Sequence, residues 1–147
     1  MSFFSMFDTA GSAMTAQRLR MNVTSSNLAN ADTVSSSTGE TYRARQPVFE
    51  AVYRQEQAAA GGNGGAGIGE ASTGVRVREI VESEAPLQQQ YNPNHPMANE
   101  EGYIFKPNVN QMEEMANLIS AQRSYESNLE VFNSAKQMYM RTLQMGR

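Results

Sequence analysis

The sequence predicts a mainly α-helical protein with a small β element. Long amphipathic helices at its N- and C-termini pack as a coiled coil, with short β-strands and loops between them. Two observations support this prediction. Apolar residues recur every three or four positions over residues 1–28 and again over 110–144, a spacing typical of a coiled-coil seam. The stretch between them instead has short apolar segments separated by Gly and Pro, as expected of strands and turns.

The C-terminal stretch gives the stronger helix signal. Residues 110–144 contain no Gly or Pro and consist mostly of good helix formers. Asn110 is a suitable N-cap, and Glu113 completes a pair that resembles a capping box. Nine positions from Met115 to Leu143 form the seam at alternating spacings of three and four. Seven of them are apolar, and the other two are Gln122 and Lys136. So long an amphipathic helix in a small chain requires a partner helix.

The N-terminal stretch carries a matching seam at Phe3, Phe7, Ala10, Met14, Gln17, Met21, Thr24 and Leu28. The simplest arrangement packs the two seams on each other, although two unrelated helices of a globular bundle would show the same pattern. We predict that the large apolar residues of both seams form the assembly interface. These residues are Phe3, Phe7, Met14, Met21, Leu28, Met115, Leu118, Tyr125, Leu129, Phe132, Tyr139 and Leu143.

The boundaries of the predicted regions follow from composition. Residues 25–39 are rich in Asn and Ser, which compete with a helix for backbone hydrogen bonds, so we expect the first helix to end near residue 28. The chain is therefore divided into an N-terminal helix and turn (1–33), a small β and loop region (34–107) and the long C-terminal helix (108–147).

The middle region contains three candidate β segments. Residues 42–53 form an extended segment that Pro47 confines to a sheet edge, and residues 75–82 alternate apolar and charged side chains as a strand does. A third short strand is expected at 102–105, after a loop at 83–97. Residues 57–74 are Gly-rich and predict a flexible insert. Their Gly-x-Gly-x-x-Gly spacing lacks the flanking strand and helix of a dinucleotide site.

Composition limits the function classes. Leu, Ile, Val and Phe make up about 17% of the chain, below the roughly 20% under which disorder is suspected when the net charge is also high. Because the net charge is low, we expect a thin core and burial against other subunits. The net charge of −3 argues against binding to nucleic acid. The chain has no Cys, no stretch apolar enough to span a membrane and no visible cleavable secretory signal.

No constellation of residues indicates catalysis. His95 is the only histidine and lies in a Pro-rich loop, without other metal-ligating side chains at suitable spacing. The paired acids at 100–101 and 113–114 are adjacent, so each pair points to different faces. We therefore predict no catalytic site, no metal, no cofactor and no enzyme activity.

Several longer motifs resemble the bacterial flagellar rod and hook family. The first follows the N-terminal helix and comprises Asn27, Leu28, Ala29, Asn30, Ala31, Asp32 and Thr33. Others lie at residues 7–17, 42–46, 91–98 and 102–109, and residues 115–126 resemble the C-terminal motif of that family. The resemblance covers nearly the whole chain except the insert at 57–74. Distal-rod and hook relatives carry a larger inserted domain, for which this chain has no room.

This resemblance implies a structural subunit of the proximal rod of the flagellar basal body. Such a subunit polymerises into the drive shaft that crosses the periplasm and transmits torque to the distal rod and hook. The implied partners are further copies of itself, the rod subunits FlgB, FlgF, FlgG and FliE, and the flagellar type III export apparatus. It would be exported without a cleaved signal peptide and would be neither a membrane protein nor a nucleic-acid binder. The alternative is a non-flagellar secreted helical adaptor or secretion chaperone.

Overall fold

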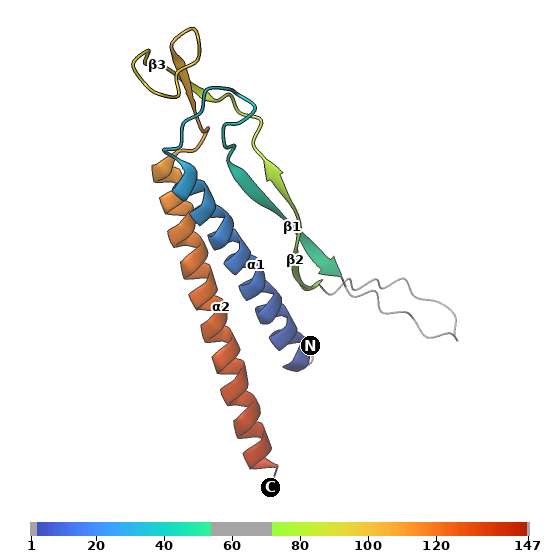
Figure 1. Cartoon of the computed structure of the whole chain (residues 1–147). Coiled ribbons are helices and arrows are strands. Elements are labelled where there is room, and N and C mark those ends of the chain that lie inside the picture. Colours follow the sequence, from blue (N-terminus) through green and yellow to red (C-terminus); the bar gives the residue numbers. More distant parts are fainter. Residues whose placement is uncertain (1–2, 54–71, 147) are drawn as a thin grey trace, which may run out of the picture.

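Two antiparallel helices form the long axis of the molecule, and two β-ribbons attach to their sides and upper end (Figure 1). The computed structural model describes residues 3–53 and 72–146. In chain order the elements are α1 (Phe3–Asn30), β1 (Arg45–Tyr53), β2 (Ser72–Glu82), β3 (Gln88–Tyr91), β4 (Tyr103–Lys106) and α2 (Gln111–Met145). Most of the predicted insert at 57–74 lies outside the described residues, and its last three residues begin β2.

The long C-terminal helix is confirmed with nearly the predicted bounds. Asn110 is its N-cap, and its side-chain Oδ1 accepts a hydrogen bond of 3.1 Å from the backbone N–H of Met112. At the other end, Gly146 terminates the helix, and its N–H donates to the carbonyl of Thr142. Since α2 has 35 residues, it is roughly 50 Å long.

The first helix continues two residues beyond its predicted end. We expected the Asn- and Ser-rich sequence to turn near residue 28, yet Asn27 to Asn30 are helical. The side chain of Asn27 bonds to other elements instead of competing with its own helix. Asn30 ends the helix, and its carbonyl accepts bonds from both the backbone N–H and the hydroxyl of Thr33.

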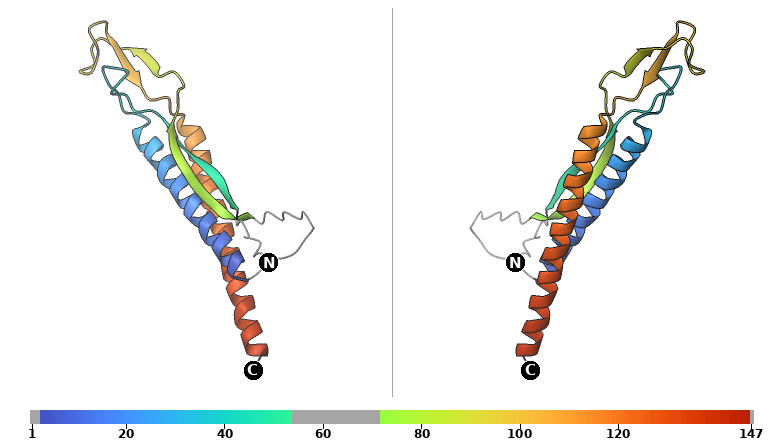
Figure 2. Two further views of the ribbon diagram at one scale, coloured as in Figure 1. Left: turned by 90° about the vertical axis from the view of Figure 1, so that its right-hand side faces the viewer. Right: turned by 90° about the vertical axis from the view of Figure 1, so that its left-hand side faces the viewer.

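The first ribbon pairs β1 with β2 in antiparallel register, from Arg45 opposite Glu82 to Tyr53 opposite Ser72. Both predicted strands are therefore confirmed, although β2 begins before residue 75. Pro47 lies in β1 opposite Ile80, where a two-stranded ribbon leaves a free edge that tolerates its missing N–H. The ribbon runs beside α1, as Figure 2 shows.

The second ribbon contains a strand that the sequence analysis missed. Residues 83–97 were predicted to be a loop, but β3 lies within them and pairs with β4. Tyr91 and Tyr103 meet edge to face with ring centroids 5.2 Å apart. Gly102 has φ +82°, and a side chain there would lie 2.9 Å from the Tyr91 ring. The partner strand, the tyrosine pair and this glycine turn therefore hold the otherwise weak strand in place.

The core of the molecule consists mainly of small residues. Among the described residues, six of the nine buried hydrophobic ones are alanines, three of them in α1 and its following turn, two in α2 and one before β1. Ala31, Ala44 and Val109 form one cluster where the two helices and β1 meet, with Tyr42 packed against it. Small side chains bury little area each, but they allow the helix backbones to approach closely.

Candidate functional site

The point where α1 ends, β1 begins and α2 begins is organised around one buried asparagine. Asn27 is 1% exposed. Its Nδ2 donates to the Arg45 carbonyl (2.8 Å) and to Glu114 Oε1 (3.2 Å). Its Oδ1 accepts from the Tyr42 hydroxyl (2.8 Å) and the Arg45 N–H (2.9 Å). One side chain thus connects three elements, and we call this arrangement the Asn27 junction.

A second asparagine extends the same connection. Asn108 Oδ1 accepts from the Ala44 N–H (2.8 Å), while its Nδ2 donates to the carbonyls of Ser83 (3.3 Å) and Ala85 (2.9 Å). It therefore joins the chain before β1, the chain after β2 and the residues that lead into α2. Buried backbone groups that lack a sheet or helix partner need such side-chain partners.

The motif at residues 27–33 divides into connecting and exposed positions. Asn27 and Ala31 are buried, Leu28 and Asn30 are half-buried, and Ala29, Asp32 and Thr33 are exposed. Asp32 Oδ2 accepts a 2.7 Å bond from Gln111 Nε2, which links the turn to the start of α2. The sequence of this motif predicts only a turn, whereas in the structure the motif fastens the two helices at one end.

The two helices contact each other along most of α1. Asn27 meets Glu114 at one end, Arg20 Nη2 donates to Asn117 Oδ1 (3.3 Å), and the rings of Phe7 and Phe132 lie 5.0 Å apart, edge to face. These pairs fix an antiparallel register. The buried or half-buried positions of α2 that recur at three- and four-residue spacing are Glu114, Leu118, Ala121, Tyr125, Asn128, Phe132 and Ala135.

These seven positions, which we call the inner line of α2, differ from the predicted seam at every second position. Leu118, Tyr125 and Phe132 belong to both, but the structure places Ala121 and Ala135 where the prediction placed the following residues, Gln122 and Lys136. As a result, Met115, Leu129, Tyr139 and Leu143 are exposed. On α1, Phe7, Met14, Met21 and Leu28 are half-buried, and the Phe3 side chain lies outside the described residues.

The carboxyl group of Glu114 is buried, which disfavours its charged form. Glu114 is one of the buried polar residues, and this burial raises the pKa of the Glu114 carboxyl above the usual range of a glutamate, with a smaller contribution from neighbouring Glu113. The hydrogen bonds from Asn27 and Thr24 and the charge of Arg20 act in the opposite direction. A charge at this position weakens the inner line of the helix pair.

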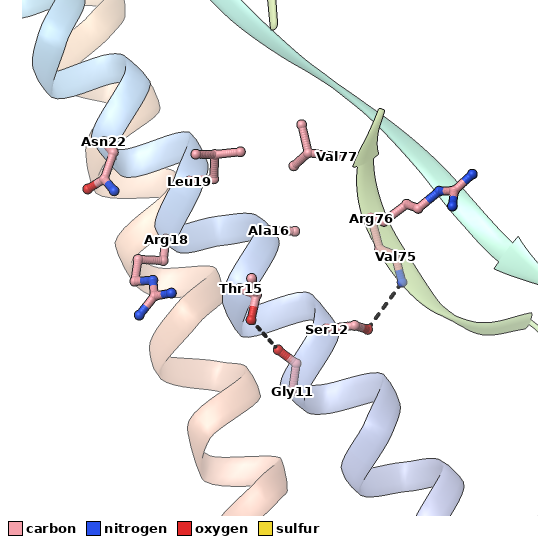
Figure 3. Close-up of a pocket in the computed structure, with 10 residues that line it drawn as sticks. All are labelled: Gly11, Ser12, Thr15, Ala16, Arg18, Leu19, Asn22, Val75, Arg76 and Val77. Atoms are coloured by element: carbon pink, nitrogen blue, oxygen red, sulfur yellow. Dashed lines mark hydrogen bonds between the residues drawn. The ribbon is translucent and has the colours of Figure 1, made fainter. Parts of the chain in front are cut away.

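A groove of about 410 Å³ separates α1 from β2 (Figure 3). Leu19 and Val77 are among its apolar lining residues, and Arg18 and Arg76 are its charged ones. At its lower end, Ser12 Oγ accepts a 3.1 Å bond from the Val75 N–H. A Cβ at Gly74 would lie 2.5 Å from that same oxygen. The absence of a side chain at Gly74 therefore permits the close approach of β2 to α1.

The described residues hold no group of three or more His, Cys, Asp or Glu side chains able to bind a metal ion. His95 lies in the loop between β3 and β4, where its Nδ1 accepts a 3.1 Å bond from the Met97 N–H. Neither described helix is long and apolar enough to cross a membrane. The features that stand out are therefore packing surfaces and structural connections.

Two protein-family models match the chain. The model described as flagella basal body rod protein matches residues 7–34, which cover most of α1 and the Asn27 motif. The model described as flagellar basal body rod FlgEFG protein C-terminal matches residues 100–145, which cover β4 and α2. Together the matched segments contain nearly all of the helix pair and two of the four junction residues, Asn27 and Glu114.

Curated relatives match over the full chain. The flagellar basal-body rod protein FlgC of Escherichia coli O6:H1 is 44% identical over 147 residues, and that of Salmonella typhimurium is 43% identical. FlgC of Bacillus subtilis is 39% identical over 158 aligned positions. In each case all of this chain and all of the relative are covered. The chain therefore belongs to the FlgC family of flagellar basal-body rod proteins.

Proposed function

We propose that this protein is a structural subunit of the proximal rod of the flagellar basal body. It polymerises with itself and with FlgB, FlgF, FlgG and FliE into the shaft that crosses the periplasm and transmits torque to the distal rod and hook. The observation that carries this proposal is the full-length similarity to FlgC proteins. The physical role is mechanical, and it requires no catalytic group and no cofactor.

The exposed side of α2 supports a role in assembly. Large apolar side chains, among them Met115, Ile119, Leu129 and Leu143, face solvent along this helix. Extended apolar surface on a small protein marks sites of protein association. We assign this surface to contacts between subunits.

The predicted interface residues then have two roles. Leu118, Tyr125 and Phe132 pack within the subunit, together with Phe7, Met14, Met21 and Leu28 of α1. Met115, Leu129, Tyr139 and Leu143 face neighbouring subunits. The 3.5-residue spacing of the inner line supports a coiled-coil packing of the pair in the assembled rod.

The three regions of the chain lie at different distances from the rod axis in this proposal. Residues 1–33 and 108–147 form the helical inner part of the rod, and residues 34–107 lie further from its axis. The subunit reaches its site through the flagellar type III export apparatus, without a cleaved signal peptide. A thin core of small residues suits a chain that crosses a narrow channel unfolded.

Gene replacement tests the proposal. Deleting the gene in the organism that encodes it should abolish swimming and rod formation, and restoring the unmodified chain should restore both. The restored chain should be recovered in purified basal bodies by mass spectrometry. A motile deletion strain with complete rods, or basal bodies that lack this chain, would refute the function.

A further inference from the structure

Methionine supplies all the sulfur of this chain, which has ten methionines and no cysteine. Five of the ten lie on α2, and all five are exposed: Met112, Met115, Met138, Met140 and Met145. The methionines of α1 are instead half-buried. The thioether groups of α2 are therefore the most accessible sulfur atoms of the helix pair.

Two of these methionines lie on the apolar side of α2 that we assign to subunit contacts. We call four exposed residues the outer stripe, because at 3.6 residues per turn they fall within about 80° of the helix circumference: Met115, Ile119, Leu129 and Met140. Met138 and Met145 lie on another side, about 120–140° around the helix from Met115. A chemical change at Met115 and Met140 therefore alters the outer stripe, and the same change at Met138 and Met145 does not.

An exposed methionine reacts with hypochlorous acid to give methionine sulfoxide. The sulfur atom gives up two electrons, hypochlorous acid accepts them, and the sulfur gains one oxygen atom. Overall, one thioether and one hypochlorous acid give one sulfoxide, one chloride ion and one proton. The reaction turns an apolar side chain into a polar one, and methionine sulfoxide reductases reverse it.

We propose that Met115 and Met140 are oxidation sites, and that their conversion to the sulfoxide keeps the subunit out of the rod. This inference rests on the proposed function and concerns the subunit before assembly, when both side chains are accessible. Oxidation makes two of the four members of the outer stripe polar. A polar group that is buried without a hydrogen-bond partner costs free energy, and this cost recurs at each copy. Because reductases restore the thioether, the exclusion is reversible.

Gln substitution tests the effect of polarity without an oxidant, since the Gln amide is polar and close in size to the Met side chain. The variant Met115→Gln/Met140→Gln replaces the natural gene, and we expect severalfold fewer rods in basal-body preparations at normal levels of the chain. The matched control is Met138→Gln/Met145→Gln, which should form rods in nearly normal numbers. Met138 is 49% exposed and Met140 is 51% exposed, so these two residues differ in the side of α2 and hardly in accessibility. Equal loss of rods in both variants would overturn the proposal.

Hypochlorous acid tests the oxidation itself. Cells that lack methionine sulfoxide reductases receive a sublethal dose while new rods form, and Met115→Leu/Met140→Leu is compared with Met138→Leu/Met145→Leu. The first variant keeps the outer stripe apolar but removes its thioethers, so it should keep forming rods. The second should lose rods as the unmodified chain does.

Mass spectrometry of the unmodified chain completes this experiment. In treated cells, an added oxygen atom should be found at Met115 and Met140 of the unassembled chain and be rare in rods. Unassembled chain without oxygen at either residue, oxidised chain equally frequent in rods, or equal loss of rods in the two Leu variants would each overturn the proposal. Basal bodies of untreated cells that lack the unmodified chain would instead refute the proposed function.

Discussion

Replacing Asn27 by Ala tests whether the junction holds the helix pair together. The substitution removes all four side-chain hydrogen bonds, which leaves the Arg45 backbone groups and the Tyr42 hydroxyl without that partner. Each unsatisfied buried group costs about 1–3 kcal/mol, but Arg45 is exposed and Tyr42 is half-buried, so water can replace some of these bonds. The expected loss is about 2–5 kcal/mol of the free energy of unfolding, a large fraction of the ~5–15 kcal/mol typical of small domains.

Asn30→Ala is the matched control for this change. Both substitutions replace Asn by Ala in the last turns of α1, so their change in helix propensity is alike. The side chain of Asn30, however, donates only to the Ser26 carbonyl of its own helix, so its loss should cost less than about 1.5 kcal/mol. Urea unfolding of the purified subunit, followed by far-UV circular dichroism, measures both. Equal destabilisation by the two variants would refute the role assigned to the junction.

Three further predictions concern other parts of the molecule. Leu129→Asp, at a residue 40% exposed, should leave the unfolding midpoint of the subunit nearly unchanged yet abolish rods in basal-body preparations. Phe132→Asp should also destabilise the subunit by ~2–4 kcal/mol because it removes the edge-to-face contact with Phe7. Motile Leu129→Asp cells with intact rods would contradict the surface assignment. Glu114→Gln should raise the urea midpoint at pH 7. Because the pKa of Glu114 is raised in the folded subunit, the protonated Glu114 contributes to stability below about pH 4.5, and this contribution is lost as the pH rises through the pKa of the folded state. The stabilisation by Gln should therefore vanish in acid. A difference between the two proteins that does not change with pH would contradict this explanation. Gly74→Ala should weaken the packing of β2 on α1, seen as faster amide exchange at Val75, and unchanged exchange would show that the ribbon can shift freely.

The sequence predicted the helices and their period but not the phase of the inner line. Large apolar residues such as Met115 and Leu129 dominate the hydrophobic periodicity of the sequence, so the pattern predicts that they form the seam. The structure instead places Ala121, which is 0% exposed, against α1. Close helix packing selects small residues at the centre of the contact, and small residues give a weak signal in a hydrophobic pattern.

The other differences also arise from tertiary contacts. The first helix extends through Asn27 because that side chain finds partners on β1 and α2, which local propensity does not register. The strand β3 contains three consecutive Gln residues and has no apolar alternation, so only its pairing with β4 defines it. By contrast, the N-cap at Asn110 was predictable because its partner, the N–H of Met112, is local.

Electron cryomicroscopy of basal bodies purified from the organism that encodes this chain tests the central claim most directly. If the protein is a rod subunit, density in the proximal rod should fit α1 and α2 as an antiparallel pair. Phe7 should lie against Phe132 within the subunit, and the Met115 and Leu129 side of α2 should lie against neighbouring subunits. A rod resolved without this chain, or one in which the exposed side of α2 touches no neighbour, would contradict the account.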